Sequence, residues 1–151
     1  MRRAFKFCFV RHPLRWYESY WKFSMQRGWP RWGYRRGRQR WHPNAALNEL
    51  ADPDFNRFIA KVIAHEPGYV TRMFAAYATP EIDFVGRQER LAEDLIEVLA
   101  RLGVSCDAER IRRWPRVNET PKEIPDPQWD PSLRKQIEEL ERPALERFGY
   151  D

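Results

Sequence analysis

The stretch that most constrains the fold of this chain is residues 5–21, where a short apolar run passes directly into a helical pattern. Its first six residues, FKFCFV, are aromatic and β-branched over the length of a typical strand. Pro13 suits the first turn of a helix, because its missing N–H would have no intrahelical partner there. The helix has one apolar face, on which side chains recur at helical spacing: Leu14, Tyr17 and Trp21. The sequence therefore predicts a buried strand, a turn at Arg11 and an amphipathic helix.

The turn between this strand and this helix is a natural place to bind an anion. Free N–H groups and the positive end of the helix dipole point at such a turn. Arg11 adds a planar guanidinium that is always charged, and Ser19, two turns into the helix, can add a hydroxyl. Arg15 lies four residues before Ser19 and shares its helix face.

The charge of the chain also favours an anionic ligand for its N-terminal part. The formal charge is +5, but residues 1–42 hold 12 Lys and Arg against a single acid, Glu18. Residues 43–151 hold 15 Lys and Arg against 21 Asp and Glu, so the two parts differ in sign. Of the 27 basic residues 22 are Arg, which favours bidentate contacts to phosphate or sulfate oxygens. A general preference of the genome for Arg codons would give the same excess.

Four stretches are informative when they are taken together: residues 11–14 (RHPL) with Ser19, residues 84–95 (FVGRQERLAEDL), residues 117–118 (VN) and residues 148–150 (FGY). In this order along the chain they resemble motifs of the PAPS-dependent sulfotransferases of the carbohydrate or bacterial type; PAPS is the sulfuryl donor 3′-phosphoadenylyl sulfate. Residues 11–14 (RHPL), followed by Ser19, resemble the 3′-phosphate-binding motif of that family. Residues 84–95 (FVGRQERLAEDL) are similar to its next strand and helix, and residues 117–118 (VN) resemble a late loop. The closing residues 148–150 (FGY) are similar to the family as well.

The resemblance implies a ligand and an activity. Arg11 and Ser19 would bind the 3′-phosphate of PAPS or of its product PAP, adenosine 3′,5′-bisphosphate, and Arg15, Arg87 and Asn118 would lie near the nucleotide. The implied fold is a single helix-rich α/β domain, a partial P-loop-NTPase-like three-layer fold with a short parallel sheet. The implied activity is transfer of a sulfuryl group, without a metal, to a hydroxyl group of an acceptor, for which we expect a carbohydrate.

The sequence departs from the family in the part that binds the 5′-phosphosulfate. The family uses a turn with Lys and Gly after its first strand, whereas none of the five Lys residues here (6, 22, 61, 122 and 135) is next to Gly, Ser or Thr. Only two main strands are predicted, too few for a parallel sheet with covered faces and paired edges. We therefore expect an upstream segment or a second chain to complete the sheet and supply the loop; the latter would make this chain one half of a two-chain enzyme. By itself the chain is expected to hold the donor nucleotide.

Residues 27–44 contain six Arg, four aromatic residues, three Gly and two Pro, and show no apolar periodicity. This composition predicts a long loop with turns that binds a polyanion or stacks on sugar rings or bases. Its candidate binding residues are Arg31, Trp32, Arg35, Arg36, Arg38, Arg40 and Trp41. In the sulfotransferase hypothesis the loop binds the acceptor, and His42 is the candidate for an otherwise unassigned general base. In the alternative hypothesis the chain is a non-catalytic module that binds nucleic acid or sulfated glycan.

Two further helices are predicted, one in the middle of the chain and one near its C-terminal end. One helix should open at Asp52, as its N-cap, and the last at Asp130, with Pro143 bending or breaking it. Residues 69–79 fit a short helix or irregular packing equally well. Residues 112–128, rich in Pro, predict an extended loop.

A second strand is predicted over residues 82–85, ended by Gly86. An amphipathic helix should follow, with an apolar face from Leu91 to Leu102 and a close at Gly103. Its acids are expected on the solvated face: Glu89, Glu93, Asp94 and Glu97.

The remaining polar and sulfur-containing residues receive structural roles. His12 is expected to cap the first helix, and Glu18 to pair with a neighbouring Arg. Cys8 and Cys106 are expected to be small buried apolar side chains. The sequence has no apolar run long enough to cross a membrane, so we expect a soluble protein of the cytoplasm.

Overall fold

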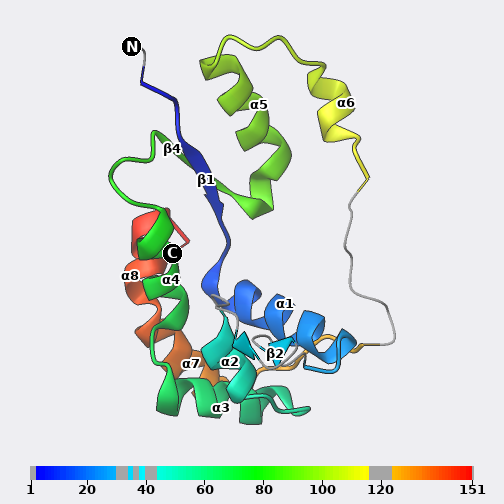
Figure 1. Ribbon diagram of the computed structural model, residues 1–151, viewed down its shortest axis with the longest axis vertical. Coiled ribbons are helices and arrows are strands. Elements are labelled where there is room, and N and C mark those ends of the chain that lie inside the picture. Colours follow the sequence, from blue (N-terminus) through cyan, green and yellow to red (C-terminus); the bar gives the residue numbers. More distant parts are fainter. Residues whose placement is uncertain (1–2, 30–33, 36–37, 40–43, 116–123, 151) are drawn as a thin grey trace.

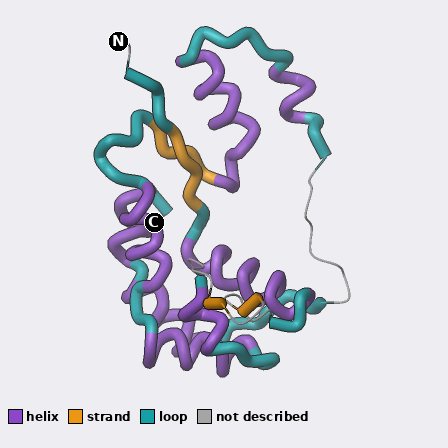
Figure 2. The backbone as a smooth tube through the Cα atoms, in the orientation of Figure 1, coloured by secondary structure: helices purple, strands orange, loops and turns teal. Residues whose placement is uncertain are grey.

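The computed structural model describes residues 3–29, 34–35, 38–39, 44–115 and 124–150. These residues form helices and two short sheets (Figure 1, Figure 2). The elements are β1 (Phe7–Val10), α1 (Pro13–Gln26), β2 (Tyr34–Arg35), β3 (Arg38–Gln39), α2 (Ala45–Glu49), α3 (Phe55–His65), α4 (Tyr69–Tyr77), β4 (Phe84–Arg87), the 3-10 turn η1 (Gln88–Arg90), α5 (Leu91–Arg101), α6 (Ala108–Arg112), α7 (Pro131–Leu140) and α8 (Arg142–Phe148). The chain is thus a helix-rich α/β protein with a short two-stranded parallel sheet.

The parallel sheet consists of β1 and β4, with Val10 opposite Arg87 at the carboxyl ends of the strands. β1 begins two residues later than predicted. The prediction that Gly86 ends the second strand is wrong, because β4 runs through it to Arg87. A Cβ at Gly86 would lie 2.5 Å from Cε1 of Phe9. Glycine is therefore needed within β4 so that the Phe9 ring can lie against the strand.

The helices on the carboxyl side of the sheet share one core. α1 packs on α4 and α7, α3 packs on α7, and α4 packs on α8, whereas α5 packs on β4 and α6 (Figure 1). The three predicted core positions of α1 are all buried, which confirms its apolar face. The core contains mostly aromatic and aliphatic side chains: Val10, Leu14, Tyr17, Tyr20, Trp21, Leu47, Phe55, Phe58, Ile59, Val62, Tyr69, Val70, Phe74, Ala78, Ile137 and Ala144.

A fully buried carboxylate, Glu141, lies within this core between α7 and α8. The helix breaks there as predicted, with Pro143 in the first turn of α8. Glu141 accepts hydrogen bonds from the Tyr17 hydroxyl at 2.6 Å and from the Thr71 N–H and hydroxyl, both at 2.7 Å. A fourth bond comes from the Val70 N–H at 3.2 Å. The carboxylate therefore caps the start of α4 and joins it to α1 across the core.

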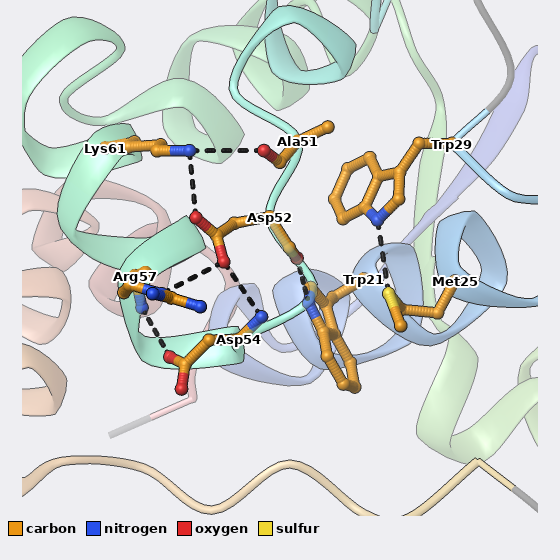
Figure 3. A network of polar contacts seen from close by, with 8 residues as sticks. All are labelled: Trp21, Met25, Trp29, Ala51, Asp52, Asp54, Arg57 and Lys61. Atoms are coloured by element: carbon orange, nitrogen blue, oxygen red, sulfur yellow. Dashed lines mark hydrogen bonds and ion pairs between the residues drawn. The ribbon is translucent and has the colours of Figure 1, made fainter.

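The start of α3 is held by two neighbouring aspartates (Figure 3). Asp54, not Asp52 as predicted, is the N-cap, and it accepts a hydrogen bond from the Arg57 N–H at 2.8 Å. Asp52 lies before the helix and pairs with Nε of Arg57 at 3.2 Å and Nζ of Lys61 at 2.9 Å. Its carbonyl accepts a hydrogen bond from the Trp21 indole at 3.0 Å. Asp52 thus ties α3 to the turn before it and to α1.

α5 confirms most of its prediction: Val98 is buried, and Glu93 and Glu97 are exposed. Its C-terminal end is also confirmed, whereas Asp94 and the two terminal leucines differ. Gly103 follows the helix with φ of 69°, the left-handed conformation of a glycine C-cap. Asp94 was expected on the solvated face, but it is 6% exposed and accepts a hydrogen bond from the Arg87 N–H at 2.6 Å. The helix turns this carboxylate toward the end of β4. Leu91 and Leu102 were expected to be apolar contacts, yet they are 47% and 43% exposed.

The structure also bears on smaller predictions about loops, cysteines and membrane spans. Residues 69–79 are mostly helical, as α4, and the predicted loop over residues 112–128 begins in the last turn of α6. The predicted loop over residues 27–44 contains a short antiparallel pair, β2 with β3. Cys106 is exposed rather than buried, because it lies in the turn between α5 and α6, and Cys8 is half-buried. Among the described residues, no helix combines the length and the apolar character that crossing a bilayer requires.

Candidate functional site

The candidate site lies where the two parallel strands end and α1 begins. Val10 and Arg87 are the last residues of β1 and β4, and Arg11 and His12 link β1 to α1. Ligands of parallel α/β sheets bind beyond the carboxyl ends of the strands. The described residues thus place Arg11 and Arg87, two of the predicted binding residues, at this end of the sheet.

The Arg11 side chain is half-buried, and no described residue is bonded to its guanidinium. Within the described residues its guanidinium makes no hydrogen bond and no ion pair. Burial lowers the pKa of Arg11, and the charges of Glu89 and Glu18 oppose that effect from farther away. An Arg side chain nevertheless stays charged in proteins, so this site contains a partly dehydrated cation with unused donors.

A hydrogen-bonded group formed by His12, Glu89 and Tyr150 lies next to Arg11. One oxygen of Glu89 accepts from the His12 N–H and the other from the Tyr150 hydroxyl, both at 2.9 Å. The His12 and Tyr150 rings also contact each other edge to face, with centroids 5.1 Å apart. Burial, and then the bond to Glu89, raises the pKa of Tyr150. Glu89 is exposed to solvent, as predicted, and through these two hydrogen bonds it also joins the start of α1 to the C-terminal residues of the chain.

The cap of α1 uses part of the predicted anion site. His12 is the N-cap, as predicted, and its Nδ1 accepts a hydrogen bond from the Leu14 N–H at 3.2 Å. Pro13 has no N–H, and the His12 N–H is bound to Glu89. Burial lowers the pKa of His12, which favours the neutral ring that this cap requires. An anion at this turn would therefore contact the Arg11 guanidinium more than the N–H groups of the helix.

The predicted residues on α1 differ in their availability. The Ser19 side chain is half-buried, and within the described residues its hydroxyl makes no hydrogen bond. Arg15 is exposed and pairs with Glu18 at 3.2 Å, which confirms the predicted role of Glu18. The second oxygen of Glu18 accepts from the Trp129 indole at 2.8 Å. Ser19 is thus free to bind a ligand, whereas Arg15 has a partner already.

Arg87 is held by packing and not by an acid. Its guanidinium lies over the Tyr150 ring, 5.2 Å from the ring centroid, and a Cβ on Gly149 would lie 2.6 Å from its Nη2. Gly149 has φ of 64°, so the left-handed turn after α8 brings the C-terminal residues against this side chain. Within the described residues no carboxylate forms an ion pair with Arg87.

An open cavity of about 500 Å³ adjoins Arg87 at the same end of the sheet. Its wall is lined by Val10, Val85, Arg87, Glu146, Arg147, Phe148 and Gly149. A volume of this size is within the range of small-molecule sites. Sequence reasoning missed Arg147 and Tyr150, because their positions depend on contacts between distant segments: α8, which contains Arg147, packs on α4, and the left-handed turn at Gly149 places Tyr150 against Arg87. The resemblance of residues 148–150 to a family motif was the one available signal.

The other predicted site residues have no described side-chain position. Asn118, His42, Arg31, Trp32, Arg36, Arg40 and Trp41 lie outside the described residues. Arg35 and Arg38 are opposite each other in the β2–β3 pair, which is all that the structure describes of them. No family model, no curated protein and no solved structure matches this chain.

Proposed function

We propose that this chain is a sulfotransferase-like protein that binds PAPS or PAP, with the 3′-phosphate on Arg11. The observation that carries the proposal is the half-buried guanidinium of Arg11, which lacks a hydrogen bond or ion pair within the described residues and lies at the carboxyl end of a parallel strand. A phosphate there would restore the hydrogen bonds that burial removes, through short charge-assisted contacts. The Ser19 hydroxyl, two turns into α1, supplies a further donor.

The reaction in this proposal is transfer of a sulfuryl group to a hydroxyl, for which a carbohydrate acceptor is proposed. Such a transfer requires that donor and acceptor be positioned and that negative charge be neutralised. Arg11 and Ser19 would fix the adenosine end of the donor, and Arg87 would add positive potential from the neighbouring strand. Asn118 and the Arg-rich segment over residues 27–42 would bind the remaining nucleotide and acceptor groups, and His42 is the proposed base.

The finer fold proposal is a sulfotransferase-like, P-loop-like sheet to which this chain contributes two strands. β1 and β4 pair only with each other among the described residues, so each has a second edge. Parallel sheets are found almost only with both faces covered, and sheets of two strands are marginal. An upstream segment or a second chain that adds strands and a Lys- and Gly-bearing phosphosulfate loop would complete both the sheet and the donor site.

The test is a calorimetric titration of the chain with PAP, in which Arg11→Ala and Ser19→Ala are compared with the parent chain. We expect saturable binding to one site, a loss of at least tenfold in affinity for Arg11→Ala and a smaller loss for Ser19→Ala. The matched control is Arg113→Ala, which removes an exposed Arg that lies 3.8 Å from Glu109 at the end of α6 and should leave affinity unchanged. Equal affinity of Arg11→Ala and the parent chain would refute the proposal.

The second candidate function is a non-catalytic module that binds a polyanion through residues 27–42. The observation in its favour is the charge of residues 1–42, with 12 Lys and Arg against Glu18. A heparin oligosaccharide would then bind with an affinity that falls steeply with salt and that survives Arg11→Ala. Salt-insensitive PAP binding together with weak heparin binding would exclude this module.

A further inference from the structure

We propose that the cavity beside Arg87 is a second oxyanion subsite, which binds an organic sulfate or phosphate ester through Arg87 and Arg147. Arg11 does not line this cavity, and the residues that do line it come from β1, β4 and the end of α8. The inference shares Arg87 with the proposed function, but it does not require the chain to bind a nucleotide. It extends that function, because Arg87 then binds a separate ester group while Arg11 and Ser19 contact the 3′-phosphate.

Arg87 is preorganised at the wall of the cavity. Its guanidinium is held over the Tyr150 ring and against the backbone of Gly149. Its own backbone N–H is fixed by the buried carboxylate of Asp94 at 2.6 Å. Within the described residues none of its guanidinium N–H groups makes a hydrogen bond. A side chain that is already immobilised loses little entropy on binding, so its unused donors favour a bidentate contact with an oxyanion.

Arg147 is fixed at the same cavity by other groups. It donates a hydrogen bond to the Ala78 carbonyl, which lies at the end of α4, and its guanidinium is 5.0 Å from the centroid of the Phe148 ring. The remaining donors of Arg147 have no carboxylate partner among the described residues. Glu146 lines the cavity as well, which leaves the wall with a formal charge of +1.

The uncharged part of the cavity wall is mostly apolar. Val10, Val85 and Phe148 give the cavity apolar surface next to the two guanidinium groups. A free inorganic anion would leave this surface in contact with water, whereas an ester with a ring or alkyl group would cover it. The chemistry of the wall therefore favours an ester of sulfate or phosphate over the inorganic ion.

The test uses phenyl sulfate, phenyl phosphate and inorganic sulfate as probes in NMR titrations of the ¹⁵N-labelled chain. We expect saturable shifts confined to the cavity wall and tighter binding of an ester than of inorganic sulfate. Arg87→Gln and Arg147→Gln should each weaken ester binding by about tenfold, since each removes a charge-assisted contact. The control Arg113→Gln, at an exposed Arg at the end of α6, should leave ester binding unchanged. Binding of either ester supports the subsite, and the tighter one identifies the ester class.

The two sites are separated by Arg11→Ala. That variant should lose PAP while it binds the esters normally, so a failure of the nucleotide proposal and a failure of the second subsite give different results. Ester binding that is lost in Arg11→Ala would show one site instead of two. Shifts that spread over the basic surface, or no saturable shifts in the parent chain, would also overturn the inference. The shift map of the parent chain does not depend on the folding of any variant.

Discussion

Glu141 in the helical core and Arg11 at the end of β1 are both charged side chains removed from water, but their surroundings differ. Glu141 is fully buried and accepts four hydrogen bonds, from Tyr17, Val70 and Thr71. Arg11 is half-buried, and within the described residues it makes no hydrogen bond or ion pair.

The difference separates a structural charge from a candidate binding charge. Burying a charged group is costly unless it is paired and hydrogen-bonded within the protein. Glu141 has such hydrogen bonds, from donors on α1 and α4, so its carboxylate joins these helices. The strand-end site does not provide such bonds for Arg11, and an anionic ligand would. The predictions below test whether these two charges respond to mutation as this account requires.

The largest expected effect is for Glu141→Ala. The substitution leaves the Thr71 hydroxyl, two N–H groups at the start of α4 and the Tyr17 hydroxyl without their acceptor. Removal of one partner from a buried charged network typically costs about 3–5 kcal/mol. We expect the free energy of unfolding to fall by about that amount, measured by urea denaturation with circular dichroism.

The control for this prediction is Glu141→Gln, which keeps the shape and one acceptor oxygen but replaces the other oxygen with a donor. It should cost less than Glu141→Ala, by about 1–2 kcal/mol, because fewer buried donors lose a partner. A Glu141→Ala chain that unfolds within about 1 kcal/mol of the parent chain would show that Glu141 does not hold the core together.

An intermediate effect is expected at His12, which lies beside Arg11 but has its partners within the chain. His12 must be neutral at Nδ1 to accept from the Leu14 N–H, and burial lowers its pKa below the ordinary value of 6.5. As the pH falls below about 6.5, the unfolded chain therefore takes up this proton before the folded chain does. The free energy of unfolding should therefore fall as the pH drops below about 6.5, and it should stop falling once His12 is protonated in the folded state too. The total loss should be about 1 kcal/mol, the usual contribution of a helix cap.

The matched control for His12 is His12→Asn, because Asn also caps helices but does not titrate. The difference in unfolding free energy between the two chains, measured from pH 7.5 to pH 5, isolates the His12 contribution from the other titrating groups. As the pH falls, the Asn variant should become more stable relative to the parent chain. A difference that is independent of pH would show that His12 does not act as a neutral cap.

Local sequence signals predicted the local features of the fold. The strand, turn and helix of residues 5–21, the glycine close of α5 at Gly103 and the break near Pro143 each depend on residues within a few positions. The burial of two acids, Asp94 and Glu141, was not predicted, because Asp and Glu usually lie on the surface. Their burial depends on partners that only the folded chain brings near, as with Tyr17 and Glu141, which are 124 positions apart.

For the candidate site, too, the sequence predicted the local features but not the long-range contacts. The position of Arg11 at a strand end follows from residues 5–21, because a strand that enters a helix fixes the place of the turn between them. The contact of Glu89 with Tyr150 spans 61 positions and has no periodic signal in the sequence. The unpaired state of Arg11 is also a three-dimensional property, since two acids are close enough to affect its pKa yet neither forms an ion pair with it.

The smallest expected effect is on the stability of Arg11→Gln, and it sharpens the comparison with Glu141 most directly. Arg11 has no hydrogen-bond partner to lose within the described residues, and its partial burial opposes its charge. Substitution by neutral Gln should therefore leave the free energy of unfolding unchanged or raise it slightly, in the same urea experiment. The matched control is Arg72→Gln, because Arg72 pairs with Glu66 at 2.6 Å and donates to the Pro67 carbonyl. In that control the free energy of unfolding should fall by a few tenths of a kcal/mol, up to about 1 kcal/mol. If Arg11→Gln destabilised the chain more than Arg72→Gln does, Arg11 would be a structural residue like Glu141, and its availability to an anionic ligand would no longer follow.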